Sequence, residues 1–201
     1  MALSPQVCFS DLIKIKLKNE FITIRVATEN DLPELEKIFE PIFLQWFISK
    51  YENCAQFIHE KLNKQSQEKS VTFVIEENKT KKIIGTTSLY ELKLKHRRLE
   101  MGSTWYGKDF VGKGFNAMTK LLVLEYLFET LGIHRVQWNT DSRNLAAQNS
   151  MLKMGFHLDG TLPYHVITYT NHVRDTLVFS VVKPQWHQVK EILKKRINEK
   201  K

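Results

Sequence analysis

The amino-acid sequence predicts an α/β (α+β) fold, in which helices cover both faces of a mixed, mostly antiparallel central sheet. Three observations support this class. Several stretches alternate apolar and polar residues with the period that is typical of strands. Two helical stretches each stop at a glycine, Gly132 and Gly155. Along the chain, the predicted elements follow the order ββαα-βββ-α-β-α-ββ-α, which indicates a sheet layered with helices.

The N-terminal part predicts a hairpin and then a long helix. Within residues 11–27, apolar and polar residues alternate on both sides of a polar turn, which is the pattern of two paired strands. Thr28 and Asp31 have the spacing of a capping box, and Pro33 falls in the first helical turn. We therefore expect a helix from this cap to about residue 48.

The other elements are predicted from periodicity and from flanking glycines. Helices are expected over residues 53–68, 114–131 and 144–154. Strands are expected over residues 71–77, 81–92, 97–106, 134–140, 156–169 and 174–182.

The length of 201 residues fits one domain, which we place at residues 1–186. Residues 187–201 are predicted to form a basic, helical C-terminal tail. From residue 183 onward, the sequence contains seven Lys and Arg residues but only two Glu residues. Such a tail can contact RNA, ribosomes or acidic proteins, and the alternative is a solvated helix. We expect no other contact with nucleic acid.

Composition favours a cytoplasmic protein. Cys8 and Cys54 are the only cysteines, as expected in a reducing compartment. The N-terminus lacks the apolar core of a signal peptide, and the apolar run at 41–48 is too short to span a bilayer. We expect no membrane association and a monomer or homodimer.

The stretch GKDFVGKGF (residues 107–115) raises the question of a nucleotide site. Gly107, Gly112 and Lys113 have P-loop spacing, but Gly114 stands where that loop needs a Ser or Thr for Mg²⁺. An antiparallel meander precedes the loop, instead of a parallel nucleotide-binding sheet. A triphosphate site is therefore disfavoured. Gly112 and Gly114 instead allow a tight turn whose N–H groups, at a helix start, bind a pyrophosphate without metal.

An ordered set of motifs surrounds this turn. EMGSTWY, VGKGFN, TDSRN, MGF and RDTLVFSVV follow one another across roughly residues 20–186. Together they resemble the GNAT superfamily of N-acetyltransferases, and most closely its RimJ/RimL-like branch of ribosomal-protein N-terminal acetyltransferase relatives. The resemblance implies a GNAT-like acyltransferase fold and acetyl-CoA (coenzyme A) as acetyl donor.

The resemblance also implies which residues bind the cofactor. Thr104, Trp105 and Tyr106 fall where the family's strand pairs its backbone with the pantetheine arm. Asn144 matches an asparagine that contacts the cofactor. The pyrophosphate loop corresponds to Val111, Gly112, Lys113, Gly114, Phe115 and Asn116. Val111 replaces the family's Gln or Arg and Asn116 its Gly or Ala, while both turn-forming glycines remain.

Glu100 is the candidate general base. Transfer from a thioester to an amine needs a proton acceptor but no enzyme nucleophile. By alternation, Glu100, Gly102, Thr104 and Tyr106 should share one strand face, with Gly102 leaving room for a substrate. The alternative for Glu100 is a surface pair with Arg97 or Arg98.

The proton donor to the leaving thiolate is not identified. Relatives use a Tyr or a Ser at positions that here hold Met151 and Ala147, and Asn139 stands where some carry a Glu. Ser150 could substitute. The histidines and cysteines show no ligand spacing, so no metal site is expected.

Two functions remain open. The first is an enzyme that moves an acetyl group to a primary amine, either a protein N-terminal amine, ribosomal or other, or a small amine. The alternative is a non-catalytic acetyl-CoA-, ribosome- or RNA-binding module on the same fold. Trp46, Phe47 and Tyr51 fall where this fold often builds its acceptor groove, although a core role is expected for at least two of them.

Overall fold

The structure, a computed structural model, describes residues 6–199 and is built on one eight-stranded sheet with the order β1-β2-β3-β4-β5-β6-β8-β7. Every neighbouring pair is antiparallel except β5 and β6, which run parallel. The strands are β1 (Lys16–Lys18), β2 (Ile22–Val26), β3 (Ser70–Glu77), β4 (Ile83–Lys93), β5 (Arg98–Tyr106), β6 (Arg135–Asp141), β7 (His157–Ile167) and β8 (Val173–Val182). The predicted mixed, mostly antiparallel sheet is confirmed.

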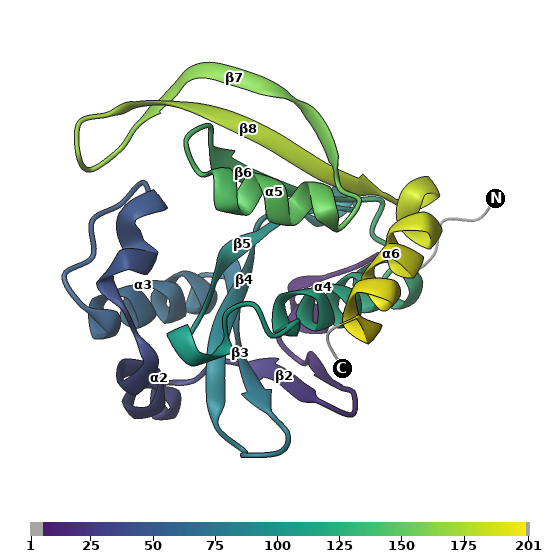
Figure 1. The fold of residues 1–201 in the computed structure, drawn as a ribbon, viewed down its shortest axis with the longest axis horizontal. Helices are drawn as coiled ribbons and strands as arrows, with labels where there is room; N and C mark the ends of the chain where they lie inside the picture. The colour runs from purple at the N-terminus through teal and green to yellow at the C-terminus, as the bar shows by residue number, and fades with distance from the viewer. Residues whose placement is uncertain (1–5, 200–201) are drawn as a thin grey trace.

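Helices lie on both faces of this sheet, with α2 and α3 on one side and α4 and α6 on the other (Figure 1). The α-helices are α1 (Phe9–Leu12), α2 (Leu32–Ile38), α3 (Cys54–Ser66), α4 (Phe115–Glu125), α5 (Leu145–Lys153) and α6 (Trp186–Asn198). The short helical turns are η1 (Glu29–Asp31), η2 (Pro41–Trp46), η3 (Leu94–His96), η4 (Lys108–Phe110), η5 (Tyr126–Thr130) and η6 (Lys183–Gln185).

Two hydrophobic clusters fill the two sides of the sheet. The larger joins α4, α5 and α6 to the sheet, and the smaller joins α2, η2 and α3 to it. Strand β3 contributes to both, because Phe73 lies in the larger cluster and its neighbour Val74 in the smaller. The sheet is therefore a buried layer between two helical layers.

The expected helix over residues 28–48 is interrupted, so that prediction is wrong in its extent. Thr28 and Asp31 do form the capping box, with the Thr28 N–H donating to Asp31 at 2.8 Å. Helix α2 ends at Ile38, because Pro41 forces the preceding Glu40 into an extended conformation.

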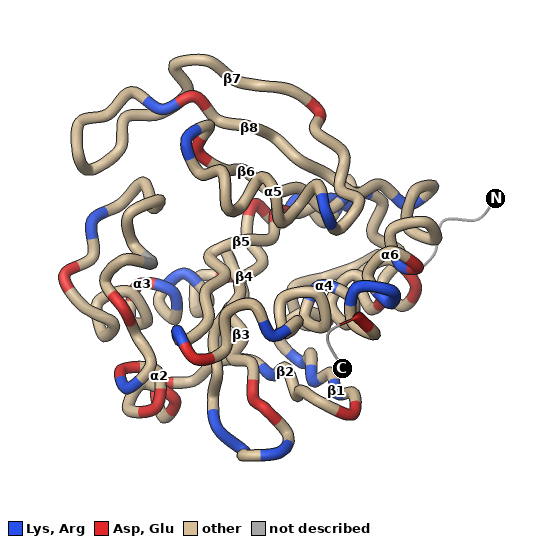
Figure 2. Tube along the Cα trace, in the orientation of Figure 1, with Lys and Arg blue, Asp and Glu red and all other residues tan. Residues whose placement is uncertain are grey.

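The C-terminal segment shares the core of the sheet. Trp186 stacks on Phe128 with ring centroids 5.4 Å apart, and Leu193 is fully buried. Acidic and basic positions are interspersed along α6 and its neighbours (Figure 2), and Lys190 pairs with Glu129 at 2.8 Å. Part of the predicted basic character of this segment is therefore neutralised within the protein.

Candidate active site

The parallel strands β5 and β6 separate in the middle of the sheet. Their register ends at the pair Glu100 and Gln137. Beyond it, β5 stays paired with β4 as far as Tyr106, and β6 stays paired with β8 as far as Asp141. The second half of β5 thus has a sheet neighbour on one side only. Along its other edge no strand of the sheet is paired, which is the arrangement to which an extended chain can add.

A bulge at Ser103 divides β5 into two halves. Thr86 pairs with Trp105 and Ser88 with Gly102, so one residue of β4 faces two residues of β5. Ser103 itself has a left-handed φ of 48°. An inserted residue reverses which side chains face which side of the sheet.

This bulge overturns the expectation that Glu100, Thr104 and Tyr106 share one face. The Tyr106 hydroxyl donates to Thr119 Oγ1 of α4 at 2.9 Å, so it lies on the α4 side. Lys120 of α4 likewise reaches Thr104. Glu100 has the opposite orientation to its neighbours Leu99 and Met101, which belong to the α4-side cluster.

The side chains of Trp105 and Tyr106 are packed into the two cores. Trp105 lies edge-on to Phe39 of the α2 side, with centroids 5.5 Å apart. Tyr106 is 8% exposed. What these residues offer to a ligand is therefore their backbone, which is the role that the resemblance implies.

The predicted pyrophosphate loop forms a left-handed turn directly before α4. Gly112 has φ of 80° and Gly114 of 86°, values that L side chains rarely adopt. A Cβ on Gly112 would meet no atom within 4 Å, and Val111 is 63% exposed. Lys113 lies over the ring of Phe110 at 5.7 Å. The turn is thus an open surface rather than a packed one.

The backbone amides of this turn have no protein acceptor. Within the described residues, the N–H groups from Gly112 to Ala117 make no hydrogen bond to backbone or side chain, whereas Met118 begins the helical ladder by donating to Gly114 O at 3.1 Å. Consecutive free amides at a helix start carry partial positive charge. Amides arranged in this way form a cradle that can bind an anion such as a pyrophosphate.

Two asparagines lie at the starts of α4 and α5, and the first of them connects the two helices. The Asn116 side-chain amide donates to Ser150 Oγ at 3.2 Å, and its Oδ1 is buried without a partner. Asn144 caps α5, where its Oδ1 accepts from the Ala147 N–H at 3.1 Å. Its side-chain amide is left for another contact.

Glu100 lies in a buried polar network at the point where the strands separate. It is 6% exposed. Asn139 of β6 donates to its Oε2 at 2.8 Å, and the Tyr90 hydroxyl of β4 hydrogen-bonds to it as well. Arg174 of β8 acts on it electrostatically. The alternative of a surface pair with Arg97 or Arg98 is not what the structure has.

Burial raises the pKa of Glu100 to about 7, although Tyr90 and Arg174 both act to lower it. The same burial raises the pKa of Tyr90 well above 10. A carboxyl group that titrates near neutral pH is suited to accepting a proton from an amine. The environment of Glu100 therefore suits a group that exchanges a proton near neutral pH.

Tyr90 fills the space beside Gly102 that we expected a substrate to use. A Cβ on Gly102 would lie 2.2 Å from the Tyr90 hydroxyl oxygen. The glycine is needed for this phenol, which reaches Glu100 past it. That expectation about Gly102 is wrong, because the partner strand supplies a large side chain.

Lys61 of α3 is a site neighbour that the sequence did not reveal. Its Nζ donates to Ser103 Oγ at the bulge, 2.8 Å away, and lies 5.7 Å from the centroid of the Tyr90 ring. Burial lowers its pKa to about 8. Helical periodicity alone does not show that this lysine faces the sheet.

The aromatic residues proposed for the acceptor groove have different positions. Phe47 and Tyr51 pack against Phe57 in the smaller core, which confirms the core role expected for two of the three. Trp46 is half-buried and lies under the Arg143 guanidinium at 6.0 Å.

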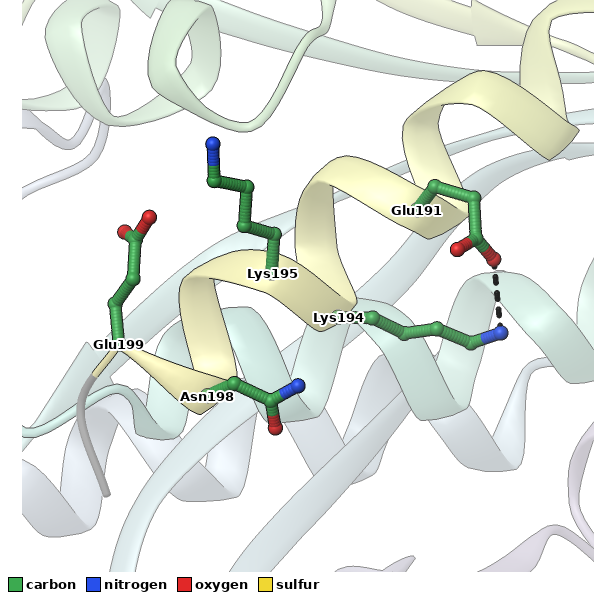
Figure 3. A pocket seen from close by; sticks show the side chains of 5 residues that line it. All are labelled: Glu191, Lys194, Lys195, Asn198 and Glu199. Atoms are coloured by element: carbon green, nitrogen blue, oxygen red, sulfur yellow. Dashed lines mark hydrogen bonds and ion pairs between the residues drawn. The ribbon is translucent and has the colours of Figure 1, made fainter.

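Other features of the described residues lie away from this site. A surface hollow on α6 (Figure 3) is lined by Glu191, Lys194, Lys195, Asn198 and Glu199. Over residues 6–199 no group of His, Cys, Asp and Glu is arranged to hold a metal ion. None of the helices in that range is long and apolar enough to cross a bilayer.

Comparison with known proteins gives consistent matches. An N-acetyltransferase of Bacillus subtilis named YoaA, uncharacterized by its name, is 33% identical over 120 residues, which are 59% of this chain and 66% of YoaA. The alignment thus spans just under two thirds of that relative.

Two solved structures share the fold. The spermidine N-acetyltransferase from Vibrio cholerae, in complex with CoA and spermine, has a TM-score of 0.71 at 20% identity, covering 84% of this chain and 99% of that one. The ribosomal-protein-S5-alanine acetyltransferase from Vibrio fischeri has a TM-score of 0.69 at 15% identity, covering 86% and 98%.

A family model described as "Acetyltransferase (GNAT) domain" matches residues 22–157, which is more than half of the chain and includes β5, the glycine turn and Asn144. With the fold and the amide cradle, this match shows that the chain belongs to the GNAT family of acetyltransferases.

Proposed function

We propose that this protein is an acetyl-CoA-dependent N-acetyltransferase that acetylates a primary amine by direct attack on the thioester. The observation that carries the proposal is the run of acceptor-free amides from Gly112 to Ala117, which follows the half-paired strand β5 after the short turn η4. The amides would hold the pyrophosphate, and the edge of β5 around Thr104–Tyr106, which is not paired with β6, would pair with the pantetheine arm. Bound acetyl-CoA would supply the activated acetyl group.

Glu100 is the proposed base. Burial raises its pKa to about 7, so the ionised carboxylate is accessible near neutral pH. In that state it can take a proton from the acceptor ammonium or from the attacking amine. Asn139 holds its Oε2 by a 2.8 Å bond and so orients the carboxylate. A backbone N–H near Trp105 is the proposed donor to the carbonyl oxygen.

The acceptor is proposed to be a protein N-terminal amine or a small amine, in keeping with a RimJ/RimL-like enzyme. The two structural neighbours act, by their names, on spermidine and on a ribosomal-protein alanine. Both acceptors present a primary amine, which is the group that Glu100 would deprotonate.

The proposal is tested in two steps. Calorimetry should show that the protein binds acetyl-CoA without magnesium and does not bind ATP with Mg²⁺. Release of free thiol is then followed with N-terminal peptides, polyamines and aminoglycosides. Absence of acetyl-CoA binding would overturn the cofactor site. Binding without thiol release for any amine would favour the non-catalytic alternative.

A further inference from the structure

A buried lysine lies where β5 and β6 separate. Lys120 of α4 is 4% exposed. Its Nζ lies 3.4 Å from Thr104 Oγ1 on β5 and 5.5 Å from the ring centroid of Trp138 on β6. Both contacts come after the last paired residues of the two strands. The ammonium group therefore bridges β5 and β6 at the point where the sheet opens.

No acidic partner accounts for this lysine. Burial lowers its pKa to about 7, and no charged group among the described residues contributes to that shift. The groups that face it are the Thr104 hydroxyl from β5 and the Trp138 indole from β6. The nearby phenol of Tyr106 is bonded to Thr119. A lysine buried without a carboxylate destabilises a fold, so its presence where β5 and β6 cease to pair points to a function.

A polar residue with an unpartnered oxygen lies on the same face of α4. Asn116 is four residues before Lys120, one helical turn away, and its Oδ1 is buried without a partner. The backbone amides of the glycine turn, which also have no protein acceptor, lie at the N-terminal end of the same helix. From the pyrophosphate cradle to the separation of the strands, one side of α4 thus presents the amides of the glycine turn, the unpartnered Oδ1 of Asn116 and the Lys120 ammonium, whose pKa no charged group affects.

Lys120 and Glu100 are on opposite sides of β5. Lys120 approaches from α4, on the side of Thr104 and Tyr106. Glu100 points to the other side, with Tyr90. A base and an acid placed on opposite faces of one strand can serve the attacking amine and the leaving sulfur separately.

We infer that Lys120 is the proton donor to the leaving thiolate, an inference that rests on the proposed function. As the bond between the acetyl carbon and sulfur breaks, its electron pair goes to sulfur and the Lys120 ammonium donates a proton there, leaving a neutral amine and the free thiol. Glu100 has accepted the proton lost by the acceptor nitrogen. Transfer of that proton through solvent to Lys120 restores both groups, so protons balance over one turnover.

Proton donation by Lys120 would replace a proton donor that is missing from the expected positions of the sequence. By the resemblance to the family, Met151 and Ala147 stand at the positions where related enzymes carry a Tyr or a Ser. Met151 is buried in the larger core and carries no proton to donate. Lys120 reaches the opening from the neighbouring helix instead.

The test compares Lys120→Met with Lys153→Met, a matched control on the exposed end of α5. Calorimetry at pH 7 measures the binding of coenzyme A and of desulfo-coenzyme A, which lacks the thiol. The wild type and Lys153→Met should bind coenzyme A about tenfold more tightly than the desulfo compound, because the ammonium stabilises the thiolate. Lys120→Met should bind both equally and lose ~100-fold in turnover.

A third variant separates charge from proton transfer. Lys120→Arg keeps a cation but cannot donate a proton, so it should keep the preference for the thiol without recovering turnover. Full turnover in Lys120→Arg or Lys120→Met would overturn proton donation, as would equal binding of the two compounds by the wild type. Failure of the wild type to bind either compound would instead refute the proposed cofactor site.

Discussion

Asn139 donates a 2.8 Å hydrogen bond to Oε2 of Glu100, and it does so two residues beyond the last position at which β6 pairs with β5. The contact links the two strands where the backbone no longer does. It also stabilises the ionised form of a carboxyl group whose pKa burial raises.

Asn139→Ala should shift the acid limb of the kcat/KM profile to higher pH by about one unit. Removing a donor to the carboxylate favours its protonated form, and a bond to a charged group contributes about 1.5 kcal/mol. Gln137→Ala is the control, because Gln137 bonds to Asn139 and not to Glu100. An unchanged profile in Asn139→Ala would contradict the orienting role of this asparagine.

Glu100→Gln should lower turnover ~100-fold or more while leaving the Kd for acetyl-CoA unchanged. The base must be deprotonated, so wild-type kcat/KM should fall as pH decreases through about 7, the pKa of Glu100. The variant should lack this limb. Stopped assays of thiol release from pH 5 to about 9 measure both effects. A fully active variant would rule out the base assignment.

Gly112→Asp should weaken acetyl-CoA binding about tenfold or more, since one unit charge beside a diphosphate costs ~1–2 kcal/mol. No atom lies within 4 Å of a Cβ at this position, so steric conflict inside the protein is not the cause. Gly112→Asn is the control, because asparagine tolerates the left-handed φ of 80° and has no charge. The difference in Kd for acetyl-CoA between the two variants should become smaller at high salt, because salt screens the charge repulsion. Equal affinities for both would argue against an anion at this turn.

Lys120→Met should stabilise the protein at neutral pH, by about 2–4 kcal/mol in urea unfolding. In the unfolded chain the lysine is protonated below pH 10.5, whereas in the fold its pKa is lowered to about 7. Its unfavourable contribution therefore grows as pH falls from 10.5 to about 7 and is then constant. The advantage of the variant should be largest at pH 6 and nearly absent at pH ~10. A variant that is less stable at pH 6 would show a structural role instead.

Leu193→Ala should destabilise the protein by about 2–5 kcal/mol, because this residue of α6 is fully buried in the larger core. Lys194→Ala is the control, since it breaks only an exposed pair with Glu191 and should cost less than ~1 kcal/mol. Thermal unfolding distinguishes them. A negligible effect of Leu193→Ala would mean that residues 187–201 are a separable tail.

The sequence by itself determined the features that depend only on residues close together along the chain. Glycines at positive φ turn the chain before α4 whatever surrounds them, so the loop at Gly112 and Gly114 could be predicted from spacing. The strand that carries Glu100 and the order of the elements follow from periodicity in the same way. The interruption of the helix over residues 28–48 could also have been predicted from the sequence, because Pro41 disfavours a helical conformation at the residue before it.

The tertiary structure decided which of these elements face one another. The bulge at Ser103 is a mismatch in length between β5 and β4, so alternation within β5 could not predict that Thr104 turns toward α4. Lys120 and Asn139 likewise reach the separation of the strands from different elements. Strand register and helix docking are set by packing between distant segments, and a single sequence carries no local pattern for them.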